Sequence, residues 1–183
     1  MSTLMSGGLL VADPFLKDEN FMRSVVLLCR HTEEGSFGFV LNKKLDVTVD
    51  ELLAEMEGLK LAVYQGGPVQ LDTVHYIHQY PDLIPDSQLL TDTICWGGNF
   101  QQLTQHLKNG TISPSKVKFF LGYSGWEAGQ LEKEMEERSW ATTTGTRKLI
   151  FNTTPEALWR NTMLHMGGVY EQMVNYPIDP QLN

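Results

Sequence analysis

The chain has little of what marks a secreted, membrane-spanning or metal-dependent protein. Its two cysteines, Cys29 and Cys95, lack the C-x-x-C spacing of metal knuckles and redox motifs. Its longest apolar runs cover about six residues, whereas a bilayer-spanning helix needs about 20. Residues 1–8 lack the basic start and apolar stretch of a secretion signal. These absences predict a cytoplasmic protein with reduced thiols and no membrane association.

Basic residues are also scarce. The chain carries 14 Lys and Arg against 22 Asp and Glu, a net charge of −8. Nucleic acids and anionic lipids are bound chiefly through Lys and Arg, so this balance argues against both partners. The nearest approach to a basic patch is Lys116 and Lys118, with Arg147 and Lys148 further along. We therefore expect a protein or small-molecule partner, and the sequence leaves the oligomeric state open.

The histidines form no metal-binding motif. The five are spread along the chain without an HExxH pattern. His75 and His78 fall in one predicted strand, where an odd separation turns their side chains to opposite faces. We expect neither a metal site nor a cofactor.

The chain has enough apolar residues for one hydrophobic core. Its 183 residues are 42% hydrophobic, and no long linker or repeat divides them. Short apolar runs predict strands over residues 8–12, 24–29, 39–41, 61–64, 73–79, 116–123 and 149–151. Capping signals predict helices over residues 48–56, 99–109 and 126–138 and after Thr154. The result is an α+β fold, with one domain over residues 1–175 and a tail over 176–183.

Two serines invite a catalytic interpretation, and a structural role explains each of them better, which leaves a hydrolase as a residual hypothesis for Ser124. Ser24 and His31 would lie about 23 Å apart at ~3.3 Å per residue, on opposite faces of one strand. Ser124 follows a strand as a nucleophile elbow would, but Trp126 replaces the second glycine. Ser124 and Glu127 instead form a capping-box pattern. No catalytic set is assembled, so a non-catalytic interaction or regulatory protein is the leading hypothesis.

Arg23 carries the alternative hypothesis. It stands before the most apolar strand, where a partly buried guanidinium needs an acidic or carbonyl partner such as Asp18. The partner is either internal or the carboxylate or phosphate of a ligand. Gly66-Gly67 could supply a backbone anion nest for the second case. This enzyme or small-anion-binding hypothesis requires Arg23, His31 and Gly66 to line one pocket.

Several blocks of the sequence together resemble the YqgE/AlgH family. The resemblance rests on the blocks Gly8-Leu-Leu-x-Ala12-x-Pro14, Asp18-x-x-Phe21-x-Arg23-Ser24-Val25-Val26-x-Leu28, His31 with Gly35, Gly38 and Leu41-Asn42, Gln65-Gly66-Gly67-Pro68-Val69, and Phe120-x-Gly122-Tyr123-x-Gly125-Trp126-x-x-Gly129-Gln130-Leu131-x-x-Glu134 with Trp140 beyond. It covers nearly the whole chain.

The resemblance implies a bacterial cytoplasmic protein with a mixed, largely antiparallel sheet, partly closed into a barrel and flanked by helices. It brings no catalytic residue and no cofactor with it. The family's label as a transcriptional regulator is a third hypothesis, which the net charge and the lack of a helix-turn-helix pattern do not favour. The candidate ligand-binding residues are Asp18, Arg23, His31, Asn42, Gly66, Gly67, Tyr123 and Trp126.

Overall fold

The computed structural model describes residues 4–91 and 93–178. The strands within these residues are β1 (Gly8–Ala12), β2 (Val25–Thr32), β3 (Gly35–Val40), β4 (Lys44–Thr48), β5 (Ala62–Gln65), β6 (Val69–His78), β7 (Gln88–Leu89), β8 (Cys95–Trp96), β9 (Val117–Glu127) and β10 (Trp140–Thr144). The helices are α1 (Val49–Leu52), α2 (Phe100–Lys108), α3 (Gln130–Glu136), α4 (Arg147–Phe151), α5 (Pro155–Met166) and α6 (Val169–Met173), with 3-10 turns η1 (Ala54–Met56) and η2 (Pro114–Lys116).

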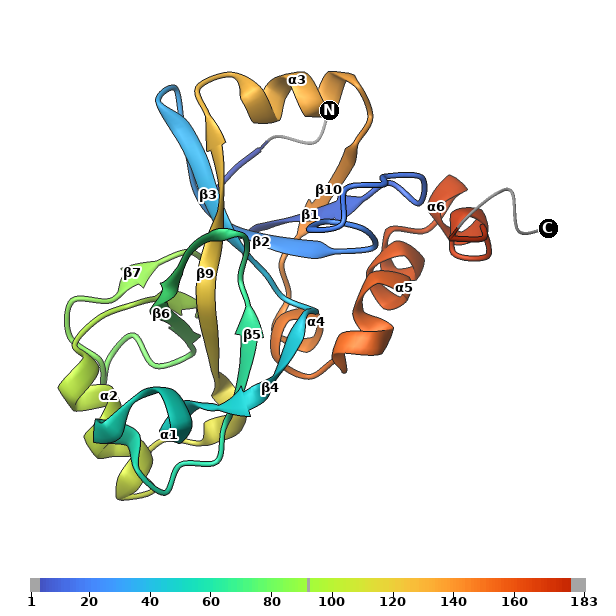
Figure 1. Cartoon of the computed structure of the whole chain (residues 1–183). Coiled ribbons are helices and arrows are strands. Elements are labelled where there is room, and N and C mark those ends of the chain that lie inside the picture. Colours follow the sequence, from blue (N-terminus) through green and yellow to red (C-terminus); the bar gives the residue numbers. More distant parts are fainter. Residues whose placement is uncertain (1–3, 92, 179–183) are drawn as a thin grey trace.

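The long strand β9 joins two halves of one sheet (Figure 1). Its C-terminal part pairs with β3, and its N-terminal part pairs with β6 and, in parallel, with β5. The main strand order is β10-β1-β2-β3-β9-β6-β8-β7, with β4 attached through β5. In Figure 1, α3 lies at one end of β9 and α1 and α2 lie near the other. Every described pairing except β5 with β9 is antiparallel, which confirms the predicted α+β class and mixed sheet.

The predicted partial closure into a barrel is wrong. Among the described residues, β10 pairs only with β1 and β7 only with β8, so the two ends of the sheet do not meet. Closure requires neighbouring strands to tilt steadily around one axis. Here β9 passes through Gly122 in a left-handed conformation (φ +71°), and β6 shifts register between Val69 and Val74. The sheet therefore divides into two differently oriented halves.

Strand β2 is covered on both faces, as its unbroken apolar run predicts. Val25, Leu27 and Cys29 belong to a core that also contains side chains of α4 and α5. Val26 and Leu28 belong to a separate core beneath α3. All five are at most 1% exposed. A third core lies between α2 and the half of the sheet formed by β5, β6 and the N-terminal part of β9.

One predicted element is wrong in type, and three others are wrong at a boundary, since the predicted strands 39–41 and 73–79 begin four residues earlier, at Gly35 and Val69. Residues 149–151 lie in helix α4 instead of a strand, because Thr146 caps that helix by accepting from the N–H of Leu149. The predicted helix 126–138 begins only at Gln130, because β9 continues to Glu127. No helix in the described segments is long and apolar enough to cross a membrane.

Candidate functional site

A groove lined by aromatic rings opens where the two halves of the sheet meet. Its volume is about 760 Å³, and its partly exposed aromatic lining consists of Phe37 from β3, His75 from β6, Trp96 from β8 and Tyr123 from β9, with the buried Trp126 at its border. Ligand pockets typically enclose roughly 300–1,000 Å³ and combine apolar walls with a few polar groups. We call this feature the aromatic groove.

Edge-to-face contacts fix the rings of the aromatic groove. The centroid of Phe37 lies 4.7 Å from that of Trp96 and 6.1 Å from that of Tyr123, with interplanar angles of 66° and 78°. His75 lies 6.0 Å from Tyr123 at 86°. Such arrangements match the preference of aromatic quadrupoles. The floor of the groove is therefore formed before any ligand arrives, which reduces the ordering cost of binding.

Several polar groups around this floor are not engaged by the fold. The guanidinium of Arg30 lies 5.4 Å above the Phe37 ring, and no described carboxylate forms an ion pair with it. Glu34 and Glu127 lie exposed on the rim and also have no described ion pair. The indole N–H of Trp96 and the hydroxyl of Tyr123 bond to no described residue, yet neither is buried without a partner. These groups are available to solvent or to a ligand.

His75 extends the groove into a second hollow. Burial lowers the pKa of His75, so its ring is neutral at pH 7. Its Nε2 lies 3.1 Å from the hydroxyl of Thr73, which itself donates to the carbonyl of Gln70. The second hollow, of about 470 Å³, shares His75 and Trp96 with the groove and adds Asp72. The two together form an elongated depression.

The opposite face of β9 carries a closed aromatic cluster. Trp126 and Trp140 are each 5% exposed, and both indole N–H groups donate to Oε2 of Glu134, at 2.7 and 3.1 Å. Gln130 donates to the other carboxylate oxygen at 3.4 Å, and Phe21 packs on both indoles. We call Phe21, Trp126, Glu134 and Trp140 the tryptophan cluster. Because its polar atoms bond to one another, it fastens α3 to the sheet.

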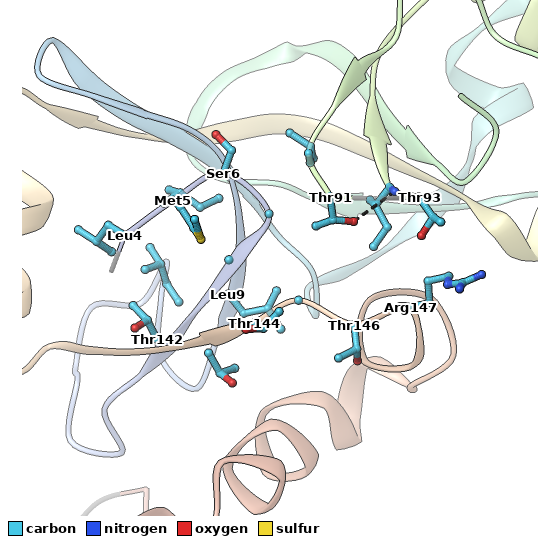
Figure 2. Close-up of a pocket in the computed structure, with 18 residues that line it drawn as sticks. Leu4, Met5, Ser6, Leu9, Thr91, Thr93, Thr142, Thr144, Thr146 and Arg147 are labelled. Carbon is cyan, nitrogen blue, oxygen red and sulfur yellow. Dashed lines mark hydrogen bonds between the residues drawn. The ribbon is translucent and has the colours of Figure 1, made fainter. Parts of the chain in front are cut away.

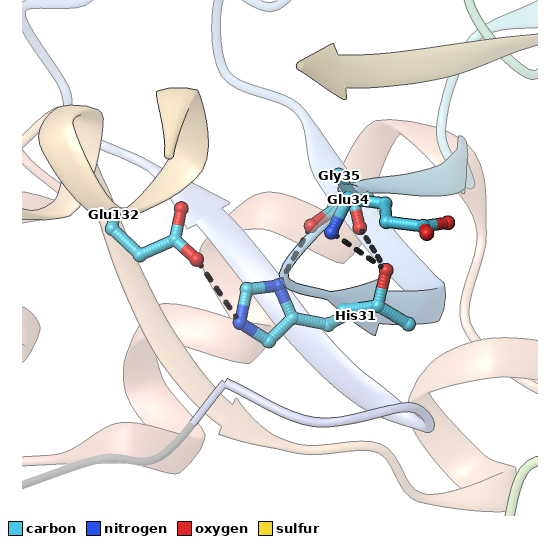
Figure 3. Close-up of polar contacts among 6 residues, drawn as sticks. His31, Glu34, Gly35 and Glu132 are labelled. Atoms are coloured by element: carbon cyan, nitrogen blue, oxygen red, sulfur yellow. Dashed lines mark hydrogen bonds and ion pairs between the residues drawn. The ribbon is translucent and has the colours of Figure 1, made fainter. Parts of the chain in front are cut away.

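His31 takes part in a serine–histidine–glutamate arrangement (Figure 3). Its Nδ1 lies 2.7 Å from Oγ of Ser36, and its Nε2 lies 3.4 Å from the carboxylate of Glu132 on α3. Hydrolytic triads use these residue types, but their serine must reach a substrate carbonyl. Ser36 is only 9% exposed and pairs with His31 on one side and Trp126 on the other. The arrangement therefore links α3 to the β2–β3 hairpin.

A second serine–histidine pair is also committed to the fold. Nδ1 of the fully buried His78 accepts the N–H of Tyr80, so the ring proton sits on Nε2, which donates to the carbonyl of Gly97 at 2.9 Å. The hydroxyl of Ser87 donates to the carbonyl of Ile84. Burial lowers the pKa of His78, although its bond to Gly97 raises it in part. His78 thus has no free nitrogen with which to activate Ser87.

Arg23 and Asn42 form a backbone clamp. Arg23 adopts a left-handed conformation (φ +52°), which costs free energy for any residue with a Cβ. Asn42 holds this turn by donating to the carbonyl of Arg23 at 2.9 Å and accepting the N–H of Val25 at 3.1 Å. The guanidinium of Arg23 donates to the carbonyl of Tyr176 and stacks on Trp159. One nitrogen of the guanidinium thus has an internal partner, whereas its buried Nε has no hydrogen-bond partner among the described residues.

Asp18, Gly66 and Gly67 also have structural roles in the backbone. The carboxylate of Asp18 accepts the N–H of Asn20 in the loop before β2. Gly66 donates its N–H to Leu121, and a Cβ on Gly67 would lie 2.2 Å from the backbone of Tyr123. This close approach of two strands requires glycine. Because the backbone N–H of Gly66 already donates to β9, it cannot also donate to an anion.

The predicted site residues therefore separate into groups. Tyr123 lines the aromatic groove, and Trp126 borders it while its indole turns to the tryptophan cluster. Arg23 and Asn42 form the clamp, Asp18 lies in the loop before β2, and His31 lies under α3. None of the four pockets described within residues 4–91 and 93–178 is lined by Arg23, His31 and Gly66 together. Sequence reasoning missed Phe37, His75 and Trp96 as groove residues. The tryptophan of the sequence Cys95-Trp-Gly-Gly98, an aromatic residue next to a turn, was the signal that could have identified Trp96.

A second large cavity lies beside β1 and β10 (Figure 2). Its volume is about 770 Å³, and threonines from two loops and β10 supply much of its polar lining. Two of these hydroxyls already serve the backbone, since Thr91 accepts the N–H of Ile94 and Thr146 caps α4. The cavity lacks aromatic lining among its described residues. The aromatic groove is therefore the stronger candidate.

Comparison with known proteins identifies the family. Residues 9–171 match the AlgH-like family model. A UPF0301 protein of Chlorobium limicola is 44% identical over 98% of this chain and 96% of that protein. A UPF0301 protein of Cytophaga hutchinsonii is 40% identical over 98% of this chain and its own full length.

Two solved structures share the fold. Protein DIP2367 of Corynebacterium diphtheriae has a TM-score of 0.78 at 23% identity and covers 96% of this chain and 94% of its own. AlgH of Pseudomonas aeruginosa has a TM-score of 0.73 at 28% identity, covering 97% of this chain and 98% of its own. The motifs, the fold and these relatives agree, and the chain belongs to the AlgH-like family, the YqgE/AlgH family that its sequence resembles.

Proposed function

We propose that this chain is a non-catalytic interaction protein that binds an extended segment of a partner protein in the aromatic groove. The observation that carries the proposal is a pre-formed aromatic floor whose charged neighbours Arg30, Glu34 and Glu127 form no described ion pair. Trp, Tyr and Arg are the residue types that dominate binding hot spots. The depression continues past His75 and Trp96, which suits an extended chain better than a compact small molecule.

The internal chemistry supports binding over catalysis. Both serine–histidine pairs are held by the fold, one beneath α3 and one in the buried β6–β8 contact. We also propose that the protein acts in the cytoplasm. Cys29 and Cys95 are free and buried, and burial raises the pKa of the Cys29 thiol, as suits an inert apolar residue in a reducing compartment.

A photo-crosslinking experiment in native cells tests the proposal. The photoreactive residue p-benzoylphenylalanine is placed at Thr32, exposed at the groove, and for comparison at Asn161, exposed on α5. We expect one discrete protein adduct from position 32 and none from position 161. The adduct should disappear in the double variant W96A/Y123A, and a peptide from the crosslinked protein should bind the purified chain.

Two results would contradict the proposal. The first is an identical set of adducts from both positions, which would mark random collisions. The second is rapid turnover of a small ester or phosphoester by the purified protein, which would mark an enzyme.

A further inference from the structure

We propose that the segment bound in the aromatic groove is basic and places an arginine or lysine side chain over the aromatic floor. This inference rests on the binding function proposed above and adds the chemistry of the partner. It follows from the ring faces, from the charges on the rim and from the shape of the depression.

The aromatic floor suits a cation. The faces of Trp, Tyr and Phe carry negative electrostatic potential, and a guanidinium or ammonium within about 6 Å of a ring centroid is attracted to it. Arg30 already uses this attraction, since its guanidinium lies 5.4 Å from the centroid of Phe37. Trp96 and Tyr123 are partly exposed in the same groove, and neither stacks with a described cation. Their faces are available to a cation from the partner.

The charges around the floor favour the same ligand. Glu34 and Glu127 lie on the rim, and Asp72 lines the adjoining hollow. Arg30 is the single Lys or Arg among the described residues that line the two depressions. None of these three carboxylates pairs with a described base. The neutral ring of His75 adds no positive charge, so the depression attracts cations and shares the sign of the whole chain, −8.

An acidic ligand fits these observations poorly. It would gain one partner, Arg30, while approaching the carboxylates of Glu34, Glu127 and Asp72. A neutral apolar segment would use the rings and leave the rim charges without a function. The elongated shape, with two hollows joined at Trp96, accommodates a peptide with side chains on either side of that ring.

Nuclear magnetic resonance of the indole N–H groups gives a direct test. The chain has four tryptophans, so its ¹H–¹⁵N spectrum reports on the groove through Trp96 and on the core through Trp126, Trp140 and Trp159. Three probes are titrated: acetyl-Arg-Val-Arg-amide, the same peptide with citrulline for arginine, and the same peptide with glutamate. Citrulline keeps the shape and most donors of arginine but carries no charge.

We expect the arginine peptide to shift the Trp96 signal and leave those of Trp140 and Trp159, which lie outside the groove, in place. Its Kd should lie about 3- to 10-fold below that of the citrulline peptide, the size of one or two exposed cation–π contacts. High salt should reduce that preference. The variant E34Q/E127Q should bind the arginine and citrulline peptides with more similar Kd values. The control variant E57Q removes an exposed carboxylate just after η1 and should keep the preference for the arginine peptide.

The possible outcomes distinguish a failure of the basic-ligand inference from a failure of the proposed peptide-binding function. Equal Kd values for the arginine and citrulline peptides, with Trp96 shifting in both titrations, would overturn the basic-ligand inference and leave peptide binding intact. A Trp96 signal that responds to none of the peptides, together with no adduct from position 32, would overturn the binding function itself.

Discussion

Two aromatic surfaces lie back to back on β3 and β9, and they differ in what their polar atoms do. Ser36 and Phe37 are neighbours in β3, and the alternation of a strand sends one toward α3 and the other into the aromatic groove. In the tryptophan cluster, the carboxylate of Glu134 takes both indole N–H groups. In the groove, the indole of Trp96 has no described acceptor.

Aromatic content alone therefore does not distinguish a core from a binding surface. Both surfaces contain tryptophan, and both use edge-to-face contacts at similar centroid distances. The distinguishing property is hydrogen-bond satisfaction, because buried polar groups in stable structure are paired. The closed surface should respond to substitution through stability, and the open surface should respond through binding.

Truncating one tryptophan on each surface should give the largest contrast. Trp140→Ala should lower the free energy of unfolding by about 3–5 kcal/mol, as for other buried aromatic truncations. Trp96→Ala should cost under ~1.5 kcal/mol, because its ring is partly exposed. Urea unfolding followed by circular dichroism measures both. Equal losses at the two positions would show that the groove is part of the core.

A matched pair of carboxylates gives the next contrast. Glu134→Ala leaves two nearly buried indole N–H groups without their acceptor, and should cost about 2–4 kcal/mol. Glu127→Ala, on the exposed rim, should stay within ~0.5 kcal/mol of the parent. The same unfolding assay applies. A harmless Glu134→Ala would mean that the tryptophan cluster is held by packing alone.

Lowering the pH should weaken the part of the sheet that contains β6, where His75 and His78 lie. His78 supports the carbonyl next to Trp96, and its folded pKa lies below the unfolded value of about 6.5. The unfolded chain therefore takes up the proton first, so the stability from neutral His78 is complete above about pH 6.5 and declines below it. The pKa of His75 is lowered too and adds a decline of the same sign.

Urea unfolding at pH 7.5 and 5.5 measures this decline. The parent should be less stable at pH 5.5, by at most ~1.4 kcal/mol per histidine for each pH unit below the unfolded pKa. His78→Gln should be less stable at pH 7.5 and lose less on acidification. A stability that rises toward pH 5.5 would contradict the assigned neutral state.

The His31–Glu132 contact should give the smallest effect. The two side chains are 18% and 46% exposed, so their attraction is screened by water. A double-mutant cycle with His31→Gln and Glu132→Gln should yield a coupling of about 0.2–1 kcal/mol. A coupling of several kcal/mol would show that this contact belongs with the closed surface and fastens α3 as strongly as Glu134 does.

Local patterns predicted the elements whose structure depends on local contacts. The apolar run of β2 indicated a strand covered on both faces, and the capping patterns at Thr48 and Asn99 marked real helix starts. Residues 149–151 are wrongly predicted as a strand. Three consecutive apolar residues are too few to distinguish the periodicity of a strand from that of a helix. The helix there depends on Thr146 and on Lys118, whose ammonium donates to the carbonyl of Ile150 from the neighbouring sheet.

The candidate site depended on contacts that no local pattern contains. Ser124 looked like a helix cap, yet its hydroxyl donates to the carbonyl of Gly66, 58 residues away. Tyr123 was named from the aromatic turn around it, whereas His75 and Trp96 reach the groove only through the pairing of β6 with β9 and β8. Sequence motifs identified the family, and the three-dimensional pairing assembled the groove.

Hydrogen exchange of the four indole N–H groups tests the central comparison most directly. The indoles of Trp126 and Trp140 donate to Glu134, and that of Trp159 donates to the carbonyl of Ala12. These three should exchange at least ~100-fold more slowly than Trp96 in the free protein, because opening a buried hydrogen bond requires local unfolding. An indole of Trp96 as slow as the other three would contradict an open groove on one face of β9 and a closed cluster on the other.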